Sequence, residues 1–272
     1  MKRKSGTRVR IVTGVALLSV LALCVFIGPV TRLCFFYAVM WFCAREMSDA
    51  LNRMGFETSP WIARVLALVF CVLFYCKDET AFYITAGSIV IMLAMLAALF
   101  RKTHMRDVLG SCIVCLYPTA FLLGYAHLSV QPDAIFYPVL LITLFAAAGC
   151  DMFAYFFGRA FGKHKLCPSI SPHKTVEGAV SGSVLGTALG LVAWAILKDI
   201  APIPWYVYVI TSFFCTIAGQ LGDLCASMIK RQAGIKDFSD MLPGHGGFID
   251  RIDSFAFALP VAFFAVVLFH AV

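Results

Sequence analysis

The sequence predicts an all-α, polytopic integral membrane protein with about nine transmembrane helices and a cytoplasmic N-terminus. Of its 272 residues, 61% are hydrophobic and only 14% are charged, against about 25% charged residues in soluble domains. Apolar stretches recur along the chain, and a helix needs roughly 20 residues to cross a bilayer. So few charges cannot cover the surface of a soluble protein of this size. The composition therefore excludes a water-soluble enzyme, a nucleic-acid binder and a disordered chain.

Nine apolar stretches are the candidate spans: 11–30, 33–44, 61–76, 81–100, 108–126, 135–157, 178–197, 203–228 and 254–272. The first follows a basic tail, as in a signal peptide, but it is nearly as long as a full span and no small-residue cleavage site follows it. The second has only about twelve residues, so we expect it to be tilted, half-inserted or buried among neighbours. Gly28-Pro29 marks the first turn between helices.

The basic residues support an odd number of spans. With a cytoplasmic N-terminus, the cytoplasmic segments hold 18 of the 22 lysines and arginines, whereas the outer loops hold only Arg32, Lys77 and Lys198. This agrees with the excess of positive charge in cytoplasmic loops of membrane proteins. The same orientation places the two longest C-terminal loops, 158–177 and 229–253, in the cytoplasm.

No internal repeat or separate soluble domain is evident. We expect one integral membrane domain over 1–272, in which 1–107 forms the N-terminal helices and 108–272 carries the active site. Eleven cysteines lie mostly within apolar runs. The Cys112-x-x-Cys115 pair has no second pair with zinc-ligand spacing, so buried, reduced thiols are favoured over a metal or disulfide site.

The polar residues near the last two apolar stretches are the first candidate site. Asp223, Ser227 and Lys230 are spaced i, i+4, i+7, so they share one face of a helix, and Arg231 lies beside that face. A carboxylate at the end of an apolar helix is costly unless it pairs with a cation or binds a metal. The turn Pro243–Gly247 is rich in glycine, so its backbone amides can approach a phosphate closely.

Asp250 and Asp253 follow this turn at the start of the last helix. Carboxylates among lysines, arginines and glycines suit a metal-bound polyphosphate, because Asp oxygens bind Mg²⁺ and cationic side chains offset the remaining phosphate charge. Simpler roles stay open. Asp253 could be only the N-cap of the last helix. Arg251 and Lys236 could be membrane-flanking charges, and His245 could be a turn residue.

The second candidate site is the basic loop at 158–177, whose cations lie among glycines and aromatic residues: Arg159, Lys163, Lys165 and Lys174. Such a segment at the membrane surface suits a lipid phosphate head group. Ordinary positive charge on the cytoplasmic side is an equally good interpretation. Asp151, near the end of the sixth stretch, could be catalytic, orient a cation or lie at the water boundary.

The C-terminal segment resembles the signature of the bacterial phosphatidate cytidylyltransferases, the CDP-diacylglycerol synthases. In that signature Ser is followed at fixed spacings by Lys-Arg, Lys-Asp, His-Gly-Gly and Asp-Arg-x-Asp. The matching residues are Ser227, Lys230, Arg231, Lys236, Asp237, His245, Gly246, Gly247, Asp250, Arg251 and Asp253. The resemblance extends from end to end of the chain, but its specific parts are 151–182 and 222–254.

This resemblance implies a reaction in which the cytidylyl group of CTP is transferred to phosphatidic acid, giving CDP-diacylglycerol and pyrophosphate for phospholipid biosynthesis. It implies Mg²⁺ as cofactor, with or without a second cation. It also implies a multi-pass protein of the plasma membrane with its active site facing the cytoplasm. A homodimer is suggested by family analogy alone, and no nucleic-acid partner is expected.

By the same resemblance, Asp223 and Asp250 are the metal ligands. The residues implied in catalysis are Asp223, Ser227, Lys230, Arg231, Lys236, Asp237, His245, Asp250 and Asp253. The residues implied in substrate binding are Asp151, Arg159, Lys163, Lys165, Ser171, Lys174, Gly246, Gly247 and Arg251. The cations would contact phosphates, and the His-Gly-Gly turn would cradle the nucleotide.

A second enzyme and a transporter are the alternative functions. A CTP-dependent polyprenol or dolichol kinase shares the membrane setting and the nucleotide, but the full signature argues against it. A membrane transporter would place ionisable residues near the bilayer midplane on broken helices. Here the centres of the spans are mostly uncharged and the polar residues gather at one face, which favours an enzyme.

Overall fold

A computed structural model describes residues 7–76 and 104–270. Five of the described helical segments are long and apolar enough to cross a membrane: Met105–Leu128, Asp133–Phe161, Val176–Leu197, Trp205–Gln232 and Ile249–Phe269. They coincide with the last five predicted spans. The chain is therefore a mostly helical, multi-pass membrane protein, as predicted. The predicted span at 81–100 lies outside the described residues.

The chain divides into two compact units, one formed by 1–130 with Gln232–Arg251, the other by Gln131–Arg231 with Ile252–Val272. The first contains α1 (Thr7–Ile27), α2 (Pro29–Arg53), α3 (Trp61–Cys76), α5 (Met105–Val114), a π-helical turn (Cys115–Ala120) and α6 (Phe121–Leu128). The second contains α7 (Asp133–Phe161), β1 (Lys165–Cys167), β2 (Ser171–Thr175), α8 (Val176–Leu197), nearly all of α9 (Trp205–Gln232) and most of α10 (Ile249–His270).

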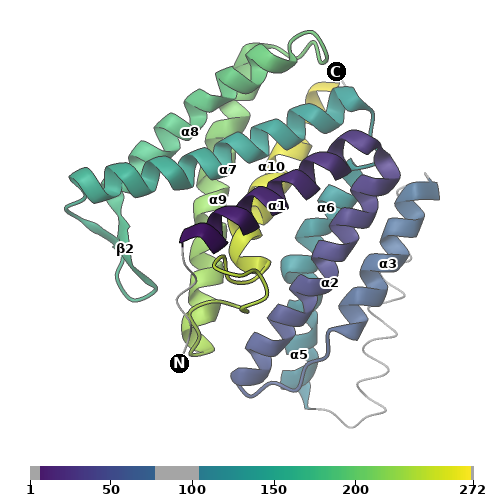
Figure 1. Cartoon of the computed structure of the whole chain (residues 1–272), viewed down its shortest axis with the longest axis vertical. Helices are drawn as coiled ribbons and strands as arrows, with labels where there is room; N and C mark the ends of the chain where they lie inside the picture. Colours follow the sequence, from purple (N-terminus) through teal and green to yellow (C-terminus); the bar gives the residue numbers. More distant parts are fainter. Residues whose placement is uncertain (1–6, 77–103, 271–272) are drawn as a thin grey trace. The chain divides into compact units, whose positions relative to one another are not determined.

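In the first unit, α2 lies beside α3 and α6, and it also contacts α1 and α5 (Figure 1). The chain turns at Gly28-Pro29, as predicted, and proline suits the first position of a helix because its missing N–H has no partner there. The prediction of a twelve-residue helix at 33–44 was wrong in its length, since α2 has 25 residues. Charged Arg32 and Glu46 flank the apolar run, but both are buried and belong to the same helix.

In the second unit, α7 and α8 lie side by side along most of their length (Figure 1). Glycines make this approach possible. A Cβ on Gly178 would come within 2.7 Å of the Ala154 carbonyl oxygen, and one on Gly182 within 2.7 Å of the Cys150 carbonyl oxygen. Small residues allow close backbone contact between helices in a membrane, where dispersion drives association.

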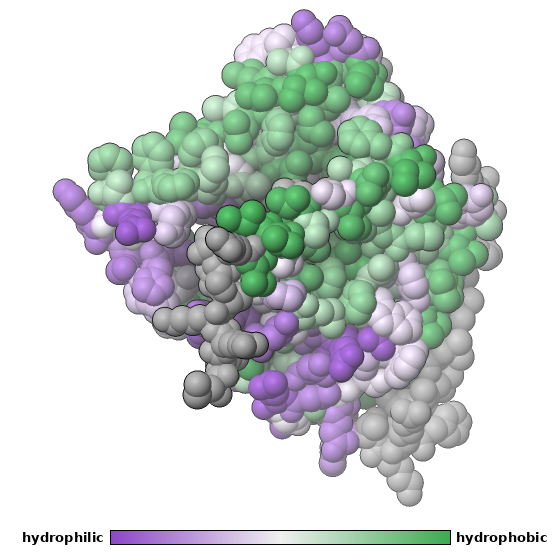
Figure 2. Space-filling view, viewed as in Figure 1, coloured by the Kyte–Doolittle hydropathy of each residue, from purple (hydrophilic) through white to green (hydrophobic). Residues whose placement is uncertain are grey.

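The segment that joins α7 to α8 is a short antiparallel hairpin of β1 and β2, in which Lys165 pairs with Thr175 and Cys167 with Ser171. Thr175 then caps α8, because its hydroxyl accepts the Gly178 amide. Figure 2 shows hydrophobic side chains along α8 and hydrophilic ones at the hairpin. The hairpin therefore extends beyond the apolar part of this unit.

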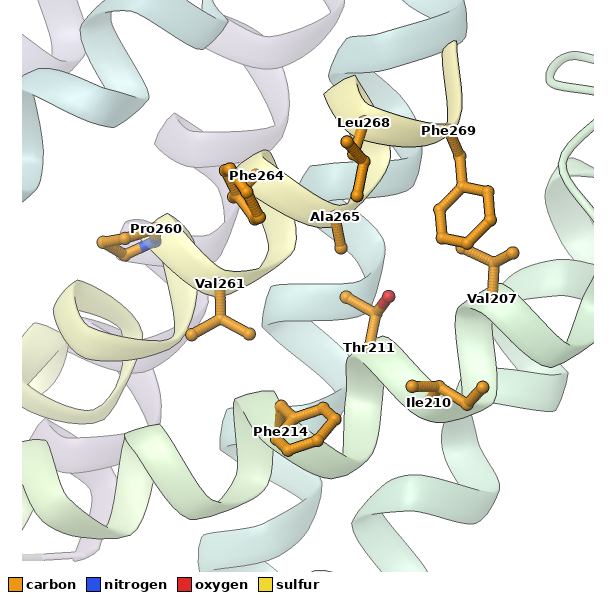
Figure 3. A pocket seen from close by; sticks show the side chains of 10 residues that line it. All are labelled: Val207, Ile210, Thr211, Phe214, Pro260, Val261, Phe264, Ala265, Leu268 and Phe269. Carbon is orange, nitrogen blue, oxygen red and sulfur yellow. The ribbon is translucent and has the colours of Figure 1, made fainter. Parts of the chain in front are cut away.

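An apolar groove of ≈ 470 Å³ lies between α9 and α10 in the second unit (Figure 3). Its walls are aliphatic and aromatic side chains, with Thr211 as the one polar residue among those that line it. Phe214 is its lining residue nearest in sequence to Asp223, and nine helical residues span roughly 14 Å. The groove is therefore separate from the polar end of α9.

Candidate active site

The predicted polar face of α9 forms as expected. Asp223, Ser227 and Lys230 all lie within the last three turns of this helix. The Ser227 hydroxyl donates a hydrogen bond to Asp223 Oδ1 at 3.3 Å. The Lys174 ammonium forms an ion pair with Asp223 Oδ2 at 2.6 Å, and about a quarter of each side chain is exposed. Because Lys174 belongs to β2, this pair joins the predicted basic loop at 158–177 to the polar face of α9.

A second contact holds the hairpin against the end of α9. The Arg231 guanidinium donates a hydrogen bond from Nε to the Ile170 carbonyl oxygen at 3.2 Å, and Ile170 lies between β1 and β2. The hairpin is thus tied to α9 at its turn and along β2. Two of the predicted phosphate-binding cations, Lys174 and Arg231, are held in place by these contacts.

Acidic residues gather beside this face. The Ser254 hydroxyl donates a hydrogen bond to Asp151 Oδ2 at 3.0 Å, which joins α7 to α10. Asp253 is 9% exposed, and Asp223, Lys230 and Asp151 all lie close enough to interact with its charge. The N-cap interpretation of Asp253 was wrong, because α10 begins at Ile249 and Asp253 lies inside it.

The other predicted cations of the basic loop at 158–177 are more exposed. Arg159 donates to the Tyr155 hydroxyl at 3.3 Å, and Lys163 and Lys165 are exposed at the start of the hairpin. The Glu177 carboxylate accepts hydrogen bonds from the amides of Lys163 and His164. Among the described residues, no hydrogen bond or ion pair joins these three cations to Asp223, so their role stays a prediction.

The rest of the signature belongs to the first unit, where Asp250 organises the glycine turn. Its Oδ2 accepts the amides of Phe238 at 2.8 Å and Gly247 at 2.9 Å. The turn closes through a hydrogen bond from the Leu242 amide to the Gly246 carbonyl. Gly246 has a φ of 86°, a conformation that glycine adopts without strain. The carboxylate of Asp250 is therefore fixed in orientation by two backbone donors.

His245 sits in the same turn. Its Nδ1 is buried and, among the described residues, has no hydrogen-bond partner. A buried polar atom without a partner requires an explanation, and a ligand is one. The other predicted residues of this segment, Lys236, Asp237 and Arg251, lie around the turn, with Lys236 and Arg251 exposed.

Glu46 on α2 was missed by the sequence reasoning. Its carboxylate accepts hydrogen bonds from the Ser239 hydroxyl and from the amides of Phe248 and Ile249. Burial raises the pKa of this carboxyl above its ordinary value, and the three hydrogen bonds oppose that rise. No signal in the sequence singled it out, because charged residues such as neighbouring Arg45 are common just after an apolar run.

The described residues contain no group of three or more His, Cys, Asp or Glu side chains that could hold a metal ion by themselves. Protein sites for nucleotide-bound Mg²⁺ use one or two carboxylates, and phosphates and water complete the octahedron. Asp223 already pairs with a cationic group, and its neighbour Ser227 supplies a hydroxyl. This donor set fits a metal that arrives with a polyphosphate.

Comparison with known proteins gives one consistent result. A sequence model of the cytidylyltransferase family matches residues 8–269. The chain is 32% identical to a phosphatidate cytidylyltransferase of Staphylococcus haemolyticus over 259 residues, which cover 93% of this chain and 96% of that protein. It is also 45% identical to the phosphatidate cytidylyltransferase of Bacillus subtilis over 121 residues, 44% of each chain. Both candidate loops fall within the region that the family model matches.

Proposed function

Because the chain belongs to the cytidylyltransferase family, we propose that it is a phosphatidate cytidylyltransferase. The proposed enzyme converts CTP and phosphatidic acid to CDP-diacylglycerol and pyrophosphate. The ion pair between Lys174 and Asp223 carries this proposal, because it brings a cation of the hairpin to the polar face of α9. A lipid phosphate and a nucleotide phosphate must meet in this reaction, and the pair joins the basic hairpin that suits the lipid phosphate to the carboxylate proposed to hold the metal.

The proposed step is an in-line displacement at the α-phosphorus of CTP. A phosphate oxygen of phosphatidic acid forms the new P–O bond, and the bond between the α-phosphorus and the oxygen that bridges to the β-phosphorus breaks. Pyrophosphate leaves with that electron pair. A phosphate monoester is already anionic near pH 7, so the attacking group needs no general base. Repulsion between the two anions is the main obstacle, and positioned cations reduce it.

Three cations are assigned to this task. Lys174 and Arg231 are held where the hairpin meets α9, and Lys230 lies on the same turn of α9 as Arg231. Lys174 binds the phosphatidate phosphate in the proposed site, with Lys163, Lys165 and Ser171 of the hairpin nearby in sequence. Lys230 and Arg231 neutralise the triphosphate. Preorganised cations stabilise the charge that develops in the transition state without reorganising.

Asp223 and Asp250 are the proposed ligands of Mg²⁺, with or without a second cation, and Ser227 completes the shell or contacts a phosphate. The metal would offset phosphate charge and help pyrophosphate to leave. In the proposed site the turn from His245 to Gly247 cradles the nucleotide, and the buried Nδ1 of His245 supports a polar contact there.

We further propose nine spans with a cytoplasmic N-terminus in the plasma membrane. The five apolar helical segments and the 18 cations in the predicted cytoplasmic segments support this arrangement. The proposed site then faces the compartment that contains CTP. A homodimer rests on family analogy alone.

The proposal is tested with the full-length protein purified in detergent. Given CTP, phosphatidic acid and Mg²⁺, it should form CDP-diacylglycerol and pyrophosphate in equal amounts, measured by lipid chromatography and a pyrophosphate assay. Omission of either substrate or of Mg²⁺ serves as the control. No product with any acyl-chain length of phosphatidic acid would refute the proposal.

A further inference from the structure

A buried carboxylate that is not among the predicted site residues holds the start of α10. Glu46 on α2 is 2% exposed. Its Oε1 accepts the Ser239 hydroxyl at 2.6 Å and the Phe248 amide at 2.9 Å, and its Oε2 accepts the Ile249 amide at 2.9 Å. About 200 residues separate it from these donors in the sequence. A buried carboxylate is costly unless it is hydrogen-bonded. Both oxygens of Glu46 accept hydrogen bonds, which explains why the fold tolerates this buried carboxylate.

Two of these donors, the amides of Phe248 and Ile249, lie at the N-terminus of α10. The first amides of a helix have no partner within the helix and carry the positive end of its dipole. Here Glu46 accepts two of them, Phe248 and Ile249, while Asp250 accepts the amide of Gly247. Two carboxylates, one from α2 and one from α10 itself, therefore hold the backbone where the glycine turn becomes helix.

The packing around this contact leaves little freedom. A Cβ on Gly247 would lie 2.7 Å from both carboxylate oxygens of Glu46, so only glycine fits at that position. The Phe248 ring stacks on Phe42, with ring centroids 5.0 Å apart and planes 8° from parallel. Phe42 lies one helical turn before Glu46 on α2. The hydrogen bonds to Glu46 and the stacking on Phe42, both on one face of α2, thus fix the backbone of residues 247–249.

We propose that Glu46 is a positioning residue of the enzyme. It holds the backbone from Gly247 to Ile249 so that the carboxylate of Asp250 is presented to the metal-bound nucleotide. The inference rests on the proposed function, which makes Asp250 a metal ligand. Groups that orient metal ligands commonly change metal affinity or activity by roughly 10- to 100-fold when they are removed.

The decisive variant is Glu46→Gln. It keeps the size of the side chain but replaces one acceptor oxygen with an NH₂ donor, which would face a backbone amide or the Ser239 hydroxyl. The matched control is Asp49→Asn, because Asp49 lies on the same helix, is 59% exposed and pairs only loosely with Arg45. Glu46→Asp keeps the charge, so it should restore part of what Glu46→Gln loses.

We expect Glu46→Gln to lower kcat/KM for CTP by roughly 10- to 100-fold while the KM for phosphatidic acid stays unchanged. Stabilisation of the protein by CTP with Mg²⁺, measured by thermal unfolding without phosphatidic acid, should weaken in parallel. Unchanged CTP kinetics would overturn the proposal. Equal losses towards both substrates together with a lowered melting temperature would also overturn it, because they indicate a purely structural role.

Two further measurements test the role of Glu46 even if the proposed reaction is wrong or the Glu46→Gln protein does not fold. Hydrogen exchange of the Phe248 and Ile249 amides should be faster in Glu46→Gln than in wild type, whether or not the protein makes CDP-diacylglycerol. If Glu46→Gln does not fold, Ser239→Ala removes one donor to Glu46 and the acceptor of the Met241 amide, and it should raise the KM for CTP several-fold. Wild-type exchange rates, or wild-type kinetics in a folded Ser239→Ala protein, would contradict the proposal.

Discussion

At the scale of single residues, Asp223 is the group on which the proposed site most depends. It accepts the Ser227 hydroxyl and pairs with the Lys174 ammonium. We expect Asp223→Asn to reduce turnover at least about 100-fold, because the amide cannot replace a carboxylate toward a cation. Turnover at saturating CTP, phosphatidic acid and Mg²⁺ measures this. Asp199→Asn, at an exposed position of the same unit, is the control, and retained activity in Asp223→Asn would remove this residue from the metal site.

Lys174 allows a test of substrate assignment. A hydrogen bond to a charged group contributes about 1.5–3 kcal/mol, so Lys174→Ala should raise the KM for phosphatidic acid by at least about tenfold. Lys198→Ala, an exposed lysine just after α8, should leave that KM unchanged. A rise confined to the KM for CTP would instead assign Lys174 to the nucleotide.

The sequence predicted part of this residue-level arrangement. Asp223, Ser227 and Lys230 could be placed on one face because helical periodicity fixes neighbours three and four residues apart. Glu46 could not be connected to Ile249, because 203 residues separate them and no periodicity relates such distant positions. The contact between Arg231 and Ile170 was missed for the same reason.

At the scale of elements, the close packing of α7 and α8 makes a prediction about stability. Gly182→Val should lower the free energy of unfolding by about 1–3 kcal/mol, because the added side chain must displace the Cys150 carbonyl. Thermal unfolding in detergent measures this effect. Val184→Leu alters a side chain that is 61% exposed on the same helix, and it should leave stability nearly unchanged. Equal stability of the two variants would contradict this packing.

The ends of a helix could be predicted from the sequence where the helix ends close to the end of an apolar run. The last five predicted spans coincide with helices of the structure. The prediction failed at 33–44, because α2 continues past the charged residues that flank this run, including buried Arg32 and Glu46. The hairpin of β1 and β2 was also missed, since strands of three and five residues are too short to show a clear alternation among so many lysines and glycines.

At the scale of the whole molecule, the charge distribution predicts orientation. Eighteen of 22 cations fall in the segments assigned to the cytoplasm, so nine spans should leave the C-terminus outside. An alkaline phosphatase fused after Val272 should therefore be active, and a green fluorescent protein at the same point should be dark. The reverse pattern would require an even number of spans and would remove one predicted helix.

The chemical class of the reaction depends on which phosphorus of CTP reaches the lipid. With CTP labelled at the α-phosphorus, the purified protein should transfer the label to a lipid product in the presence of phosphatidic acid and Mg²⁺. With CTP labelled at the γ-phosphorus, the label should appear only in pyrophosphate. Label from the γ-phosphorus in the lipid would identify a kinase and would contradict the assignment of this chain as a cytidylyltransferase.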